Sequence, residues 1–225
     1  MQLLLIDAIG PFFRGLSKGR TNWSKIPFAL LPLEEIERRR CFDRIGEDLR
    51  SFAARVHQVG YNAVSLDDVA HLADHPWYEA EIRDMIALYR QEFRRLFVIL
   101  REQGLAIYLT MDVLSLTPRL KGKLYGDERR INEFLSELLD QLLQDFPEIA
   151  GIIMRIGESD GRDVKDRFRS ELHIRTPDQL NRLLETLLPI FERQGRHLIL
   201  RTWTVGAYPV DDCIWRQSTL TRSLE

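Results

Sequence analysis

Ten charged or aromatic residues in this sequence end short apolar runs or lie close behind them. Carboxylates accept hydrogen bonds from hydroxyl groups and transfer protons, and arginine binds a carboxylate through two parallel hydrogen bonds. Tryptophan adds a flat apolar surface, so together these residue types suit a carbohydrate, whose ring has polar edges and apolar faces. The residues are Asp7, Arg14, Asp67, Asp68, Asp112, Arg155, Glu158, Asp160, Arg201 and Trp203.

The apolar runs recur at a regular spacing. Their polar ends fall at 7, 67, 112, 158 and 203, so the last three steps are 45, 46 and 45 residues. A helical stretch fits in every gap. Parallel strands that alternate with helices give this pattern, and their carboxyl ends meet at one face of the sheet. We therefore expect the polar side chains to converge there.

The segments between the runs have apolar residues at helical spacing. In the first of them the apolar stripe extends from Ile36 to Val56, and Gly60 follows as a glycine past a helix end does. The last begins at Thr176, a hydroxyl cap, with Pro177 at the first helical position. Helices are predicted over about 34–58, 77–102 and 128–145, and from Thr176 to just before Gly195. One face of the second helix carries an apolar stripe made of Ile82, Ile86, Tyr89, Phe93, Leu96 and Leu100.

Two α/β architectures fit this order of elements, a (β/α)8 barrel of the TIM type and an open doubly wound sheet. No Gly-rich phosphate-binding turn follows the first strand, and long loops follow every strand, which favours the barrel. Only five strands are visible in 225 residues, whereas a complete barrel takes about 250. We predict one domain over 1–225 that is partial, comprising the first five β-α units of a barrel incomplete at its C-terminus.

Composition excludes several classes of partner. The net charge of −2 gives no electrostatic reason to expect nucleic acid. No apolar run approaches the roughly 20 residues needed to span a membrane, and no signal-peptide core opens the chain, so we expect a cytoplasmic protein. The two cysteines, Cys41 and Cys213, have neither metal-ligand nor redox spacing. We expect no metal and no cofactor, and the oligomeric state is not specified.

The most specific segment is Gly151-Ile-Ile-Met-Arg-Ile-Gly-Glu158-Ser-Asp160-Gly161. Its apolar run delivers Arg155 and then Glu158 in a turn flanked by glycines. A carboxyl group at such a strand end, shielded from water, can have a raised pKa and act as a general acid. The alternative is a structural role, in which Glu158 caps the following segment or pairs with Arg155.

The run of strands resembles the catalytic barrel of glycoside hydrolases, and most closely the α-glucuronidase group of family 67. In that group a fourth-strand segment ends in a Glu followed by Gly-containing sequence, and Glu158 occupies the similar place. Arg201-Thr-Trp203 resembles the group's fifth-strand Trp-Arg-Ala region in a different order, whereas Asp67-Asp68 stand where the group has non-acidic residues. The resemblance covers about 60–205 and implies a glycosidase with Glu158 as general acid.

A glycosidase also needs a second carboxyl group. In related barrels it comes from strands six to eight, for which the sequence shows no pattern, so we expect Asp112 or Asp68 to serve if the five units act alone. Arg155, Arg201 and Trp203 would then position the sugar. Two other functions fit: a non-catalytic carbohydrate-binding or truncated barrel, and a metal-dependent hydrolase using the i, i+4 pair His71 and His75.

Overall fold

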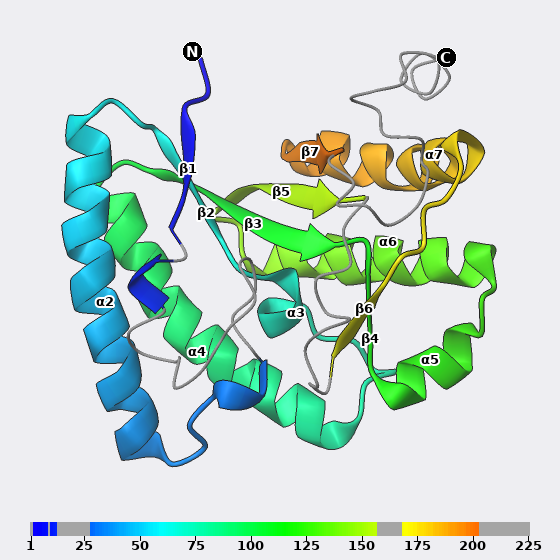
Figure 1. Ribbon diagram of the computed structural model, residues 1–225, viewed down its shortest axis with the longest axis horizontal. Coiled ribbons are helices and arrows are strands. Elements are labelled where there is room, and N and C mark those ends of the chain that lie inside the picture. The colour runs from blue at the N-terminus through cyan, green and yellow to red at the C-terminus, as the bar shows by residue number, and fades with distance from the viewer. Residues whose placement is uncertain (1, 9, 13–27, 157–167, 203–225) are drawn as a thin grey trace.

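The computed structural model of the protein describes residues 2–8, 10–12, 28–156 and 168–202. Four of the predicted site residues, Arg14, Glu158, Asp160 and Trp203, lie outside these ranges. The described elements are shown in Figure 1 and are, in order, β1 (Leu5–Asp7), η1 (Phe28–Leu30), α2 (Glu35–Gln58), β2 (Ala63–Leu66), α3 (Val69–Leu72), α4 (Ala80–Glu102), β3 (Ala106–Asp112), β4 (Leu114–Leu116), α5 (Pro118–Leu124), α6 (Glu128–Asp145), β5 (Ile149–Arg155), β6 (Arg169–Glu171), α7 (Pro177–Gln194) and β7 (His197–Arg201).

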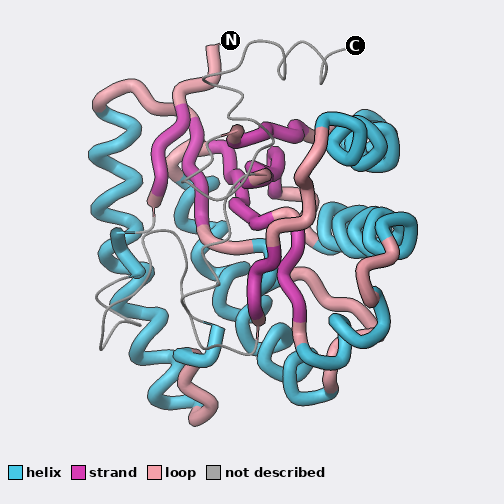
Figure 2. Tube along the Cα trace, turned by 45° about the vertical axis from the view of Figure 1, so that its right-hand side comes forward, coloured by secondary structure: helices cyan, strands magenta, loops and turns pink. Residues whose placement is uncertain are grey.

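Five strands form one parallel sheet in the order β1-β2-β3-β5-β7. Each strand therefore pairs with the next predicted strand along the chain, and none is inserted between earlier ones. This order differs from a doubly wound sheet, in which the strand order reverses at a switch point. It is the order of consecutive units of a (β/α) barrel, and the predicted α/β fold of this type is confirmed. Figure 2 shows the helices around the outside of the strands.

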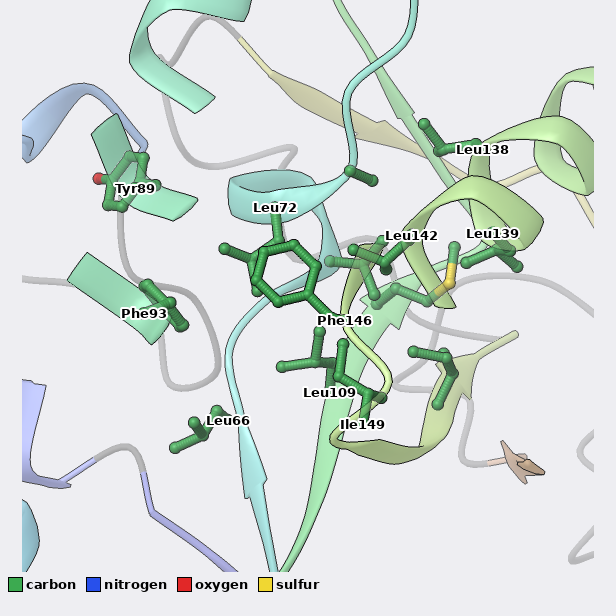
Figure 3. Close-up of a cluster of buried hydrophobic side chains, with 14 of the residues drawn as sticks. Leu66, Leu72, Tyr89, Phe93, Leu109, Leu138, Leu139, Leu142, Phe146 and Ile149 are labelled. Atoms are coloured by element: carbon green, nitrogen blue, oxygen red, sulfur yellow. The ribbon is translucent and has the colours of Figure 1, made fainter. Parts of the chain in front are cut away.

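The two faces of the sheet differ in chemistry because side chains alternate along each strand. One face belongs to the main apolar core through Val64, Leu66, Leu109 and Met154, which are buried against the helices. Figure 3 shows part of this core, where Leu109 and Ile149 of the sheet lie near Leu142 and Phe146. The opposite face, which is the interior side in a barrel, carries the polar or small residues Ser65, Tyr108, Thr110, Asp112, Gly151 and Arg155.

The helices follow the predicted periodicity closely. The α6 bounds match those expected, and all six residues of the predicted α4 stripe are buried: Ile82, Ile86, Tyr89, Phe93, Leu96 and Leu100. Thr176 caps α7 as predicted, since its hydroxyl accepts a hydrogen bond from the N–H of Gln179. One expectation is wrong. The buried side of α2 packs against α4 and leaves Ile36, in the first turn of the helix, 68% exposed.

Two short strands that the sequence did not predict form a second sheet. β4 and β6 pair antiparallel, with Ser115 opposite Ser170. β4 begins two residues after the end of β3, so the small sheet lies just beyond the carboxyl edge of the main sheet. Helix α5 begins two residues after β4. The carboxyl ends of the parallel strands therefore have an additional layer of structure beside them (Figure 1).

Candidate active site

A cluster of charged side chains lies at the carboxyl ends of β2, β3 and β5. Asp67 and Asp68 follow β2, Asp112 is the last residue of β3, and Arg155 is the last residue of β5. The register explains their meeting, since Asp112 pairs with Arg155 across β3 and β5. The predicted convergence of these four residues is therefore found in the structure. We refer to Asp67, Asp68, Asp112 and Arg155 as the strand-end cluster.

Arg155 lies at the centre of the strand-end cluster. Its Nε is 2.8 Å from Oδ1 of Asp112, and its Nη2 is 4.0 Å from Oδ2 of Asp68. All three side chains are at most 2% exposed. A guanidinium buried this deeply is tolerated only with opposite charges beside it. In the described conformation Arg155 therefore orients Asp112 and Asp68 rather than presenting its guanidinium to solvent.

Asp67 has a different environment from the other two aspartates. Thr110 Oγ1 donates a hydrogen bond to its Oδ1, whereas its Oδ2 is buried and has no hydrogen-bond partner among the described residues. Burial raises the pKa of Asp67 to about 8, helped by the charges of Asp68 and Asp7 and opposed by Arg155 and Thr110. Asp67 thus holds a proton at neutral pH, which reduces the negative charge crowded around one arginine.

Asp68 is fixed by local structure as well as by charge. It is the N-cap of α3, where its side chain accepts a hydrogen bond from the N–H of Ala70. The backbone N–H of Asp68 in turn donates to Nδ1 of His71 at 3.1 Å, which completes a capping box. His71 therefore has a structural role that the sequence did not reveal, although its position three residues after an Asp is the signal for it.

His71 and His75 do not share a helix face, because α3 ends at Leu72. His75 instead accepts a hydrogen bond from the N–H of Trp77 at Nδ1, and its Nε2 is 3.2 Å from Glu137. Within the part of the chain that the structure describes, no group of three or more His, Cys, Asp or Glu side chains is arranged to hold a metal ion. The i, i+4 spacing thus reflects two separate structural contacts.

The other two described candidates lie on the flanks of the strand-end cluster. Arg201 is in register with Arg155 at the end of β7 and is half-buried. Asp7 ends β1 beside Ser65 and is exposed, and its charge raises the pKa of Asp67. The strand ends therefore present an acidic side at β1 and a basic side at β7.

A second polar contact on the same sheet face was missed by sequence reasoning. The hydroxyl of Tyr108 is 2.7 Å from Nδ1 of His197, and the two rings are stacked with an interplanar angle of 8°. Gly151 lies between them in register, and a Cβ there would be 2.7 Å from the Tyr108 ring. The alternation along the strands places this layer below the strand-end cluster on the interior face. Tyr108, four residues before Asp112, could have been assigned to that face from the period of two.

Solved structures with a similar fold are glycoside hydrolases. A GH138 enzyme targeting pectin rhamnogalacturonan II matches with a TM-score of 0.55 and 13% identity, over 100% of this chain and 25% of its own. A GH5_18 enzyme from Streptomyces cattleya, in complex with GlcNAc, matches with a TM-score of 0.44 and 18% identity. The match covers 69% of this chain and 39% of that enzyme. A glycoside hydrolase family 5 enzyme from Prevotella bryantii matches with a TM-score of 0.45 and 13% identity. The match covers 98% of this chain and 58% of that enzyme.

The chain thus spans a quarter of the length of the GH138 enzyme. The five parallel strands and their helices have the fold of consecutive units of a (β/α) barrel. At these identities the likeness concerns the fold alone, and the neighbours belong to GH138 and GH5, so a relation to family 67 is not shown. Neither a protein-family model nor a curated protein matches this chain. No helix among the described residues has the length and apolar character to cross a membrane.

Proposed function

We propose that this chain supplies the first five β-α units of a carbohydrate-active barrel, and that Glu158 is its general acid. The observation that carries the proposal is the meeting of Asp67, Asp68, Asp112 and Arg155 at the carboxyl ends of neighbouring parallel strands, where (β/α) barrels have their active sites. Glu158 follows the last residue of β5 by three positions in the sequence. It would protonate the leaving glycosidic oxygen.

In this proposal the buried residues position the reacting groups. Arg155 fixes Asp112, and Asp112 is 1% exposed, which supports a positioning role over nucleophilic attack for this carboxylate. Arg201, at the end of β7, and Trp203, two residues further along the sequence, would bind the sugar with Arg14 and Asp160. The second catalytic carboxyl group would then come from further strands.

Further strands also fit the edges of the described sheet. Among the described residues β1 pairs only with β2, and β7 pairs only with β5. Leu198, Ile199 and Leu200 of β7 are only half-buried, although the corresponding positions of the central strands β2 and β3 are buried. Strands that closed the barrel would cover these apolar side chains and both open edges.

The test compares Glu158→Gln with Glu102→Gln in the natural full-length protein, assayed on pectic oligosaccharides and on dinitrophenyl glycosides. Loss of a general acid should lower kcat on the oligosaccharide by about 10²–10⁴-fold. The loss should be much smaller on the dinitrophenyl glycoside, whose leaving group needs little protonation. Glu102, exposed at the end of α4, should be replaceable without effect. Unchanged oligosaccharide turnover in Glu158→Gln would contradict the proposal.

A non-catalytic carbohydrate-binding barrel is the second candidate function. The deep burial of Asp67 and Asp112 favours it over catalysis by these two carboxyl groups, because a group that attacks a substrate or exchanges a proton with it must be accessible. Saturable oligosaccharide binding by the wild-type protein with no turnover on any substrate would identify this function.

A further inference from the structure

A cleft of about 490 Å³ lies beside the strand-end cluster and uses none of its residues. Its walls come from β4, α5, the start of α6 and the segment after β6, which lie together in Figure 1. Its volume is within the range of small-molecule sites, about 300–1,000 Å³. The lining combines apolar side chains such as Leu116, Leu124 and Ile131 with polar ones, as binding sites for small polar molecules do.

The charged groups of the cleft are paired, with one exception. Lys121 forms an ion pair with Glu171, and Glu128 accepts two hydrogen bonds from Arg182 at 2.6 and 3.1 Å. The Arg175 guanidinium has neither an ion pair nor a hydrogen bond among the described residues. The lining therefore contains two cations, Lys121 and Arg175, and two carboxylates, Glu128 and Glu171, and both carboxylates already have a partner. Arg175 therefore supplies one available positive charge, with the fork geometry that matches a carboxylate.

His173 also lines this cleft. Its Nε2 is buried and has no hydrogen-bond partner among the described residues. Burial lowers the pKa of His173, and the nearby Arg175 lowers it further against the opposing effect of Glu128. The imidazole is therefore neutral at pH 7. A neutral imidazole nitrogen pairs well with a hydroxyl group, and its burial without a partner is costly.

Tyr125 forms the rim of the cleft and is 90% exposed. It ends α5 with φ at 33°, a left-handed conformation that is rare for a bulky residue. Its ring contributes nothing to the core, so packing does not explain an aromatic residue here. An exposed aromatic ring beside polar groups provides a flat surface for the apolar face of a sugar.

We propose that this cleft is an accessory binding site for an acidic sugar residue, a uronic acid, whose carboxylate pairs with Arg175 while a hydroxyl group contacts His173 and the ring lies on Tyr125. The choice of a sugar rests on the proposed function. The balanced charge of the remaining lining fits a single carboxylate better than a phosphate, whose second negative charge would face Glu128 and Glu171. A neutral sugar would leave Arg175 unpaired.

The test uses amide NMR shifts of the full chain titrated with methyl α-D-galacturonoside, methyl α-D-galactoside and acetate. The galacturonoside should shift amides of β4, α5 and the segment after β6. The galactoside, which has a hydroxymethyl group in place of the carboxylate, and acetate, which lacks the ring, should each bind at least about tenfold more weakly. Arg175→Ala and Tyr125→Ala should each weaken galacturonoside binding at least about fivefold, while Arg101→Ala, an exposed arginine at the end of α4, should leave it unchanged.

Equal binding of all three probes, or unchanged binding in Arg175→Ala, would overturn the inference. The Glu158→Gln variant separates this result from the proposed function, since it should keep the cleft shifts whether or not turnover is lost. If Glu158→Gln abolished the galacturonoside shifts while Arg175→Ala retained them, the acidic sugar would belong to the strand ends, and the accessory site would be refuted.

Discussion

Replacing Asp67 by Asn should stabilise the protein increasingly as the pH rises. Asp67 is 1% exposed and shares its surroundings with Asp68, so its ionised form is unfavourable in the folded state. Asparagine has the same shape, keeps an oxygen that accepts the hydrogen bond from Thr110, and carries no charge. The variant therefore removes the ionisation and little else.

The size of the effect follows from the two pKa values of Asp67. Folded Asp67 holds its proton up to a pKa of about 8, while in the unfolded chain the carboxyl group has its ordinary value of 3.8. Between these values the unfolded chain binds fewer protons than the folded one, so the free energy of unfolding falls as the pH rises. Each pH unit is worth at most about 1.4 kcal/mol. The advantage of Asp67→Asn should grow by up to about 4 kcal/mol between about pH 5 and about pH 8.

Urea unfolding, followed by tryptophan fluorescence at several pH values, measures this difference directly. Asp84→Asn, at an exposed position on α4, is the control for removing one carboxylate from the surface. Subtracting the wild-type curve from each variant curve cancels the other titrating groups. A difference between Asp67→Asn and wild type that stayed constant across the range would refute the assignment of a buried proton to Asp67.

Two further substitutions test the packing of the strand ends and of the interior face. Arg155→Met should lower the free energy of unfolding by about 3–5 kcal/mol in urea titrations, because Asp112 would be left buried without its counter-charge, and Arg155→Lys should recover part of the loss. A loss no larger than that of an exposed ion pair would contradict the buried role. Gly151→Ala should cost about 1–3 kcal/mol by thermal or urea unfolding, because the added Cβ would lie 2.5 Å from the His197 carbonyl oxygen and 2.7 Å from the Tyr108 ring. Unchanged stability would show that β7 can move away from β5 at no cost.

Local periodicity was sufficient to predict the main elements. The α4 stripe from Ile82 to Leu100 is buried as expected, because apolar residues at helical spacing have only one way to reach the core. The small sheet of β4 and β6 could not be found in this way. Leu114 and Glu171 are paired but are 57 residues apart in the chain, and three-residue strands carry almost no periodic signal.

The site was predictable in position but not in environment. The carboxyl ends of parallel strands share one edge, so the sequence brought Asp67, Asp112 and Arg155 together correctly. Their burial depends on how the surrounding segments pack, which strand spacing does not encode. Sequence reasoning expected Arg155 to position the sugar, whereas in the described structure its guanidinium lies against Asp112.

The pairing of β4 with β6 has a consequence for communication within the molecule. β4 starts two residues after Asp112, and its partner β6 leads to His173, so the wall of the cleft that β4 forms is continuous in the chain with the carboxyl edge of the main sheet. A ligand bound in the cleft that held β4 and β6 in place would also restrict the backbone that carries Asp112. A ligand in the cleft and a ligand at the strand ends must then change each other's affinity by the same factor. A polymer that engaged both places would be held more tightly than the separate affinities imply.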